Sequence, residues 1–142
     1  MSMIDDVRAE YMASGDPALK TYYPAWLKNI ADDATLEGSM LDGVVVGAES
    51  VRSIVLTIKS LYERQEFKFA GPCPDGFLED YLAQFNGEPL GCVVLVKYNA
   101  AGQTQHVVAS YRPRTSVVHV AQLLAEKFAG TGIAEHFSPA SP

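Results

Sequence analysis

The strongest constraint on the fold of this chain is a run of three predicted strands joined by two short turns. The strands cover residues 77–85, 90–98 and 103–112, and the turns read Asn-Gly-Glu-Pro (86–89) and Asn-Ala-Ala-Gly (99–102). Asparagine and glycine at such positions favour the tight turns that join antiparallel neighbours. The sequence therefore predicts an antiparallel sheet, and a further short strand at 66–71 is expected to join it.

The central strand of this run is apolar on both of its faces. Because side chains alternate along a strand, Cys92, Val94 and Val96 share one face, and Val93 and Leu95 share the other. Two apolar faces need two coverings. Helices of the same chain can cover one face, and a second copy of the chain is a plausible cover for the other, so we expect a homodimer.

Segments with helical periodicity precede and follow these strands. The predicted helices cover residues 3–13, a stretch that begins at 16–17, residues 48–62 and residues 115–128. Pro24 falls inside the second stretch, where a proline deletes a hydrogen bond, so we expect a kink or break there with Trp26 facing inward. A strand at 34–41 places Leu36 and Met40 on one face. The predicted fold class is α+β, with one domain over 1–130 and a flexible tail at 131–142.

Length and charge exclude several classes of protein. The chain has 142 residues, enough for one core but not for two of ordinary size. Its net charge of −6 repels nucleic acid and anionic lipid, and it contains no basic patch that would override this. The longest apolar run, 93–96, is too short for a membrane-spanning helix. Two isolated cysteines after a polar N-terminus favour a reducing cytoplasm.

Several short motifs resemble one superfamily in their order and spacing. They are Ala-Asp-Asp-Ala-Thr-Leu-Glu at 31–37, Gly-Ala-Glu-Ser-Val-Arg-Ser at 47–53, and the turn sequences at 85–89 and 97–102. The chain thereby resembles the SnoaL-like and ketosteroid-isomerase-like branch of the nuclear-transport-factor-2-like superfamily. The resemblance implies a cystatin-like fold, in which a strongly curved antiparallel or mixed sheet forms a cone with helices on its concave side. It also implies a pocket in the cone and, often, a homodimer.

The catalytic residues of that branch are absent at the matching positions. Ketosteroid isomerases carry a catalytic aspartate where this chain has Gly38, and an oxyanion-binding acid where it has Val94. SnoaL-like cyclases carry a histidine and an aspartate on the last strand. Here His106 is present, but aliphatic residues replace the aspartate. Neither mechanism can run on these side chains, so whether the chain is an enzyme stays open.

Glu79 is the one carboxylate that alternation places on the predicted pocket face. If it is buried among Trp26, Met40 and Tyr111, desolvation raises its pKa and it can act as an acid or base near neutrality. If the strand register slips by one residue, Glu79 is instead solvated. Tyr111 is either a hydrogen-bond donor to a ligand carbonyl or a packing residue. His106 is the weakest catalytic candidate, expected to be exposed or at the subunit interface.

The expected function is the binding of a small apolar molecule by an isomerase or cyclase relative. The residues expected to line its pocket are Trp26, Met40, Tyr62, Glu79, Tyr81, Cys92, Val94 and Tyr111. Three widely spaced histidines give no metal-ligand set, and no phosphate-binding loop is present, so neither a metal nor a cofactor is expected. The alternative is a non-catalytic interaction or dimerisation module whose pocket is filled by its own aromatic side chains.

Overall fold

A mixed six-stranded sheet forms the backbone of the structure. The computed structural model describes residues 23–137, so the expected helix at 3–13 and the start of the helical stretch expected from 16–17 lie outside this range. The strands are β1 (Ile30–Gly38), β2 (Val45–Val46), β3 (Arg64–Cys73), β4 (Gly76–Phe85), β5 (Glu88–Tyr98) and β6 (Thr104–Arg112). Their order in the sheet is β2-β1-β6-β5-β4-β3, and every pair is antiparallel except β1 with β6. The sheet is open, with β2 and β3 at its edges.

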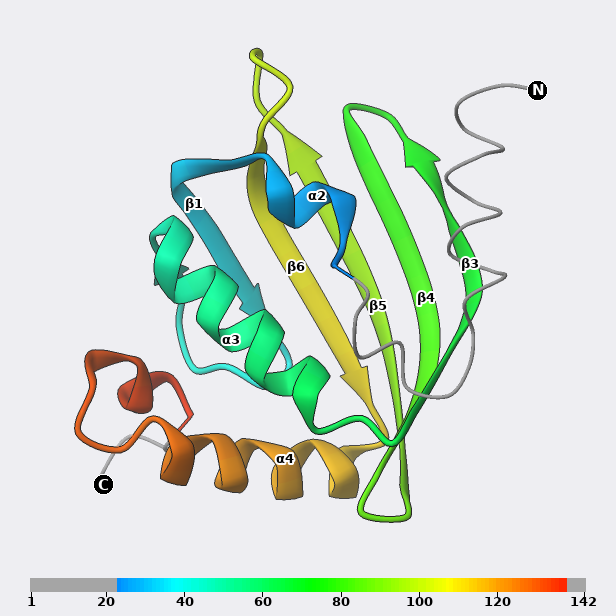
Figure 1. The fold of residues 1–142 in the computed structure, drawn as a ribbon, viewed down its shortest axis with the longest axis vertical. Helices are drawn as coiled ribbons and strands as arrows, with labels where there is room; N and C mark the ends of the chain where they lie inside the picture. Colours follow the sequence, from blue (N-terminus) through cyan, green and yellow to red (C-terminus); the bar gives the residue numbers. More distant parts are fainter. Residues whose placement is uncertain (1–22, 138–142) are drawn as a thin grey trace.

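Helices cover one face of this sheet. They are α2 (Ala25–Lys28), α3 (Ala48–Ser60) and α4 (Arg114–Lys127), followed by the 3-10 helix η1 (Gly132–His136). Figure 1 shows α2 and α3 in front of β1, β6 and β5, with α4 across the end of the sheet where β6 finishes. The α+β fold class predicted from the sequence is confirmed, as are the hairpins that join β4, β5 and β6.

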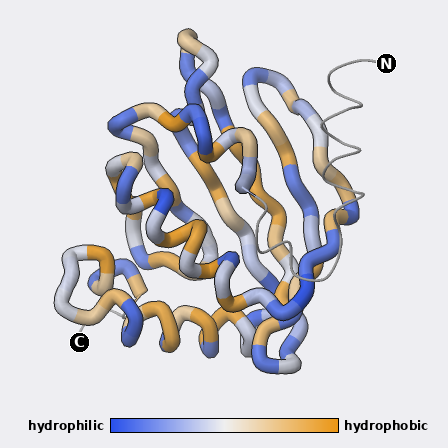
Figure 2. The backbone as a smooth tube through the Cα atoms, in the orientation of Figure 1, coloured by the Kyte–Doolittle hydropathy of each residue, from blue (hydrophilic) through white to orange (hydrophobic). Residues whose placement is uncertain are grey.

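The core lies between the sheet and these helices. Val51, Ile54 and Ile58 form the buried stripe of α3, and Val120 and Leu124 form that of α4. Figure 2 shows the corresponding alternation of hydrophobic and hydrophilic residues along the strands and helices. Helix α2 begins directly after Pro24, because a proline can occupy a helix start without losing an internal hydrogen bond. Trp26 is buried, as expected.

Strand β1 is displaced from its expected position. It covers Ile30–Gly38 rather than 34–41, so Met40 lies beyond the strand end, although it is still buried. The strand ends where Gly38 approaches the backbone of β6: a Cβ atom at Gly38 would lie 1.9 Å from the carbonyl oxygen of Ala109. Beyond Gly38 a side-chain hydrogen bond takes the place of the backbone bonds between the strands: the Ser39 hydroxyl accepts from the Tyr111 amide at 2.6 Å.

The segment at 131–137, expected to be loose, instead packs against the core. His136 Nδ1 lies 2.9 Å from the Asp42 carbonyl oxygen, and the Asp42 amide donates to the His136 carbonyl at 2.7 Å. Phe137 is only 6 % exposed and stacks on Phe128, with ring centroids 6.0 Å apart. Apolar burial and this reciprocal pair of hydrogen bonds hold the segment in place. Residues 138–142 lie outside the described range.

Candidate functional site

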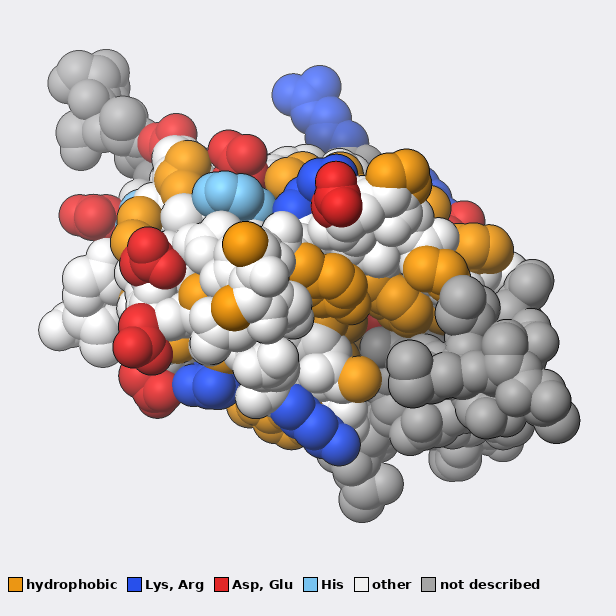
Figure 3. Space-filling model, turned by 90° about the horizontal axis from the view of Figure 1, so that it is seen from above, with side chains coloured by type: hydrophobic (Ala, Val, Ile, Leu, Met, Phe, Trp, Pro, Cys, Tyr) orange, Lys and Arg blue, Asp and Glu red, His pale blue; other side chains and the backbone are white. Residues whose placement is uncertain are grey.

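A pocket lies between the sheet and helix α3. It encloses about 50 Å³, and its lining comes from α2, α3, all strands from β3 to β6, the end of β1 and Phe137. A site needs about 10–15 Å³ to admit one water molecule, so this pocket has room for a few water molecules and is not packed shut. In the view of Figure 3, apolar side chains gather in the middle of the face, and most charged side chains lie towards its edges.

The floor of the pocket is organised as two rows of paired residues that run across the strands. In the first row Glu79 pairs with Val94, Val94 with Ala109, and Ala109 with Gly38. In the second row Phe67 pairs with Tyr81, Tyr81 with Cys92, and Cys92 with Tyr111. Paired residues lie about 5 Å apart and point to the same face of the sheet. The register therefore brings residues from five strands, β1 and β3 to β6, to one surface.

Glu79 is buried at the end of the first row. It is 3 % exposed, so its side chain points into the molecule rather than into solvent. Its Oε2 accepts a hydrogen bond of 3.1 Å from Trp26 Nε1, which fixes the carboxyl group against helix α2. The alternative reading of Glu79 as a solvated strand residue is therefore wrong, because the strand keeps the register that the alternation predicts.

The second row holds a group of buried hydroxyl and thiol side chains. The hydroxyls of Tyr62, from the end of α3, and Tyr81 lie 2.5 Å apart. Burial raises the pKa of the Tyr62, Tyr81 and Tyr111 hydroxyls well above 10, and it raises the pKa of the Cys92 thiol to about 12. These four groups are therefore neutral at physiological pH. Neutral phenols can donate hydrogen bonds to a ligand carbonyl and can also accept them.

The structure brings together most of the predicted pocket residues. Trp26, Met40, Tyr62, Glu79, Tyr81, Val94 and Tyr111 all line the cavity. Cys92 belongs to the second row but is fully buried there and is not part of the lining. His106 does not line the pocket either. It is exposed, with Nδ1 2.7 Å from the Thr35 hydroxyl, so it has no access to a pocket ligand.

Sequence reasoning missed three informative residues of the lining. Gln65 and Lys59 are 5 % and 8 % exposed, and Phe137 closes one side of the pocket. Burial lowers the pKa of the Lys59 ammonium from its usual value. The spacing from Gln65 to Phe67 and from Val55 to Lys59 indicates a shared face in each case. No sequence pattern singles out Phe137, because its burial depends on how the C-terminal segment folds back.

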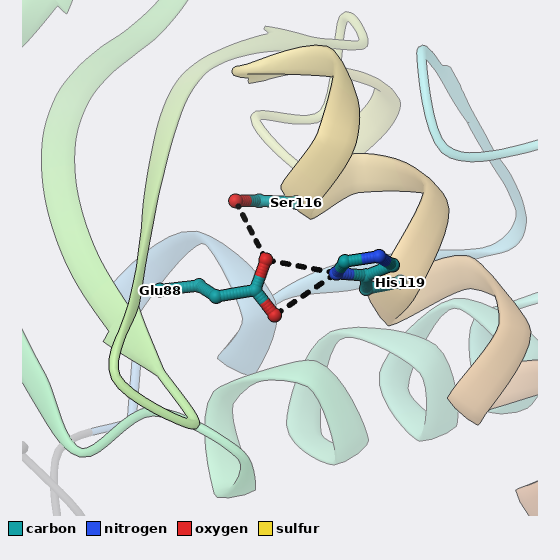
Figure 4. Close-up of polar contacts among 3 residues, drawn as sticks. All are labelled: Glu88, Ser116 and His119. Carbon is teal, nitrogen blue, oxygen red and sulfur yellow. Dashed lines mark hydrogen bonds and ion pairs between the residues drawn. The ribbon is translucent and has the colours of Figure 1, made fainter.

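A second polar cluster, outside the pocket, joins α4 to the hairpin between β4 and β5. Figure 4 shows the carboxylate of Glu88 between His119 and Ser116. His119 Nδ1 lies 2.8 Å and 3.0 Å from its two oxygens, and the Ser116 hydroxyl donates to it at 3.5 Å. In a nucleophilic triad the histidine lies between the serine and the acid. Here the acid lies in the middle, so the cluster fastens the helix and does not activate Ser116.

The part of the chain that the structure describes contains neither a cluster of potential metal ligands nor a membrane-spanning helix. Between residues 23 and 137, no three histidine, cysteine or acidic side chains gather closely enough to hold a metal ion. Within the same range no helix combines the length and apolar character that crossing a bilayer requires. Cys73 and Cys92 are both free thiols.

Comparison with solved structures identifies the fold. An uncharacterised protein with a cystatin-like fold from Silicibacter pomeroyi aligns with a TM-score of 0.70 at 14% identity, covering 92% of this chain and 88% of that one. A steroid delta-isomerase from Pseudomonas aeruginosa aligns with a TM-score of 0.66 at 14% identity, covering 72% and 77%. An NTF2-like protein of unknown function from Cytophaga hutchinsonii aligns with a TM-score of 0.52 at 16% identity, covering 82% and 96%.

Sequence comparison adds nothing to this result, since no family model and no curated protein matches the chain. Identities of 14% to 16% establish a shared fold and leave the function to the site itself. The likeness agrees with the motifs at 31–37 and 47–53. The chain therefore has the cystatin-like fold of the nuclear-transport-factor-2-like proteins.

Proposed function

We propose that this chain binds a small, largely apolar molecule in the pocket between α3 and the sheet. The observation that carries the proposal is an open cavity with an apolar wall and a few polar groups gathered in two adjacent rows. Sites for small molecules have this composition, because apolar contact supplies affinity and a few polar groups fix orientation. The steroid delta-isomerase that shares the fold supports the same use of the pocket.

The polar side chains in the two rows favour a ligand that has a polar group at one end. Glu79 presents a carboxyl group fixed by Trp26, and the tyrosine hydroxyls in the next row are neutral donors. A carboxylate beside neutral donors can move a proton at a carbon next to a carbonyl, because the donors stabilise the charge that develops on oxygen. Proton transfer by Glu79 is thus the reaction that this pocket supports best.

The position of Glu79 differs from the family pattern in a defined way. The two family positions for acidic groups, Gly38 and Val94, lie in the same row as Glu79. The row therefore carries its carboxyl group one strand away from Val94 and three strands away from Gly38. At about 4.8 Å between strands, Glu79 lies roughly 14 Å from the position of the usual base. A substrate would have to be oriented differently from a steroid in a ketosteroid isomerase.

A matched pair of variants tests whether the pocket binds ligands. Val94→Phe fills the cavity from its floor, whereas Val93→Phe adds the same ring on the opposite face of the same strand. Native mass spectrometry of protein purified from cells, together with a thermal-shift screen of small apolar compounds, reports on binding. We expect wild type and Val93→Phe to bind and Val94→Phe not to bind. Equal binding by both variants would place the ligand elsewhere and contradict the proposal.

The alternative function, a module with a self-filled pocket, is less well supported. Trp26 and Met40 line the cavity without filling it, and Phe85 is buried outside the lining. A role in dimerisation is compatible with ligand binding, and a separate observation favours it. The face of the sheet away from the helices carries a row of paired apolar residues, namely Leu78, Leu95 and Val108, and the exposed Leu82 lies further along β4 on the same face.

We therefore also propose that two copies of the chain pair through this outer face. Arg112 and Asp80 lie on that face and form an ion pair of 3.1 Å. Because the two charges neutralise each other, two copies can meet there although each chain carries a net charge of −6. Light scattering tests this. We expect a dimer of about 31 kDa, twice the 15.4 kDa chain, and a monomer for Leu95→Asp. A monomeric wild type at micromolar concentration would refute the pairing. We further propose that the protein is located in the cytoplasm.

A further inference from the structure

One acceptor atom in the pocket wall has no partner within the described residues. Gln65 Oε1 is buried, and no hydrogen-bond donor lies within reach of it. The residue is 5 % exposed and belongs to the cavity lining. A buried carbonyl oxygen without a donor is costly, and native proteins contain few of them. The atom therefore indicates a donor that the described residues do not supply.

The register places this oxygen beside the tyrosine row. Gln65 pairs with Ala83 on β4, and Tyr81 lies two residues along the same strand on the same face. Such diagonal neighbours have Cα atoms about 7–8 Å apart, within reach of one small molecule. Glu79 continues the same face of β4. One residue of the lining, Gln65, thus carries a buried unsatisfied acceptor, and it lies near the Tyr62 and Tyr81 hydroxyls, which already have each other as partners.

From this geometry we infer that the ligand is an uncharged molecule with an apolar body and one N–H or O–H group, which donates to Gln65 Oε1. The inference rests on the proposed function, because it requires a ligand in the pocket, and it adds the chemical class. A site built around an unpaired acceptor discriminates strongly in favour of a donor, since an analogue without the donor leaves the acceptor buried and unpaired. Gln65 is then the residue that determines specificity.

Two probes of the same shape test the inference. Indole carries one N–H donor, and benzofuran replaces that group by an oxygen that cannot donate. We expect wild type to bind indole about 10-fold or more tightly than benzofuran, measured by calorimetry or by ligand-observed NMR. In Gln65→Met, which has nearly the same volume and no acceptor of comparable strength, the preference should fall below about 3-fold.

The stability of the ligand-free protein provides a second readout. Because Gln65→Met removes an unsatisfied buried group, it should leave the melting temperature unchanged or raise it by a few degrees. A structural role for Gln65 predicts the opposite. The control is Gln84→Met, on the neighbouring strand β4 and outside the lining, which should keep the indole preference of wild type.

The possible outcomes distinguish a failure of this inference from a failure of the proposal that the pocket binds a ligand. If wild type binds neither probe up to the solubility limit of each, the pocket function itself is contradicted. If it binds both equally, or if Gln65→Met keeps the preference, the pocket binds ligands but Gln65 does not select them. Tighter binding of benzofuran would mean that the amide turns its NH₂ group to the cavity. A fall of several degrees in the melting temperature of Gln65→Met would show that Gln65 is structural. Every outcome named here after the first overturns the inference about Gln65.

Discussion

Trp26 donates its indole N–H to the carboxyl group of Glu79 across 3.1 Å, and this bond joins two residues that are 53 positions apart in the sequence. It connects the short helix α2 to strand β4 at the wall of the pocket. Both partners are buried, at 5 % and 3 % exposure, so water does not compete for either group. The bond holds the one carboxyl group of the pocket floor at a defined position.

The Glu79 carboxyl group should be replaceable by an amide but not by an alkyl group. In Glu79→Gln the amide oxygen can still accept from Trp26, so we expect a change in unfolding free energy below about 1 kcal/mol. In Glu79→Leu the buried indole N–H loses its acceptor, and the cost should be about 1–3 kcal/mol. Urea unfolding, followed by the fluorescence of Trp26, the only tryptophan, measures both. Equal losses in the two variants would show that the charge, not the hydrogen bond, stabilises the fold.

Introducing an aspartate at Gly38 should fail for a steric reason. Any Cβ there would lie 1.9 Å from the Ala109 carbonyl oxygen, so a side chain forces β1 and β6 apart. We expect Gly38→Asp and Gly38→Ala each to lose about 3 kcal/mol or more, with no isomerase activity in Gly38→Asp. Denaturant unfolding and a steroid isomerase assay check these two points.

A second glycine separates the clash at Gly38 from the effect of backbone angle. Gly102 also has a positive φ, +80°, but a Cβ there would meet nothing within 4 Å. Gly102→Ala should therefore cost only about 1 kcal/mol, the strain of the angle alone. A loss at Gly38→Ala no larger than that at Gly102→Ala would show that the two strands separate easily, and an aspartate would then fit.

Stability should fall as pH rises above about 9, because the buried thiol of Cys92 keeps its proton in the folded state. Its pKa rises from 9.0 to about 12, so the unfolded state releases the proton first. The contribution is fully present below pH 9 and is lost towards pH 12, by up to about 1.4 kcal/mol per pH unit. Urea midpoints at pH 7, 8, 9 and 10 reveal the slope.

Comparison with Cys92→Ala isolates this thiol. Lys59, whose pKa is lowered by burial, changes stability in the opposite direction, and it is present in both proteins. The decline between pH 9 and pH 10 should therefore be shallower in Cys92→Ala than in wild type. Identical slopes would mean that the thiol ionises as readily in the folded protein as in the unfolded chain.

The two cysteines should differ sharply in reactivity. Cys92 is fully buried within the second row of the pocket floor, whereas Cys73 is only half-buried at the end of β3. A thiol reagent should label Cys73 in the native protein within minutes and Cys92 only on unfolding. Cys73→Ser should abolish the rapid phase. Fast labelling of Cys92 in that variant would show that the pocket floor opens frequently.

Local patterns were sufficient for the fold class and the central hairpins, and partly for the site. The turns at 86–89 and 99–102 predicted the neighbours of β5, and alternation placed Glu79 and Tyr81 on one face of β4. Prediction failed where a contact came from a distant segment. Strand β1 ends at Gly38 because of the Ala109 backbone, and Phe137 is buried because Asp42 holds the C-terminal segment.

Sequence alone determined the α+β class and the succession of strands from β3 to β6, because these depend on neighbours in the chain. Only the tertiary structure decided that Trp26 meets Glu79, that Cys92 is fully buried outside the lining, and that the buried Gln65 Oε1 has no donor among the described residues. These relationships are set by strand register and by packing between segments far apart in sequence. Periodicity assigns a residue to a face, but it does not specify which residue lies opposite.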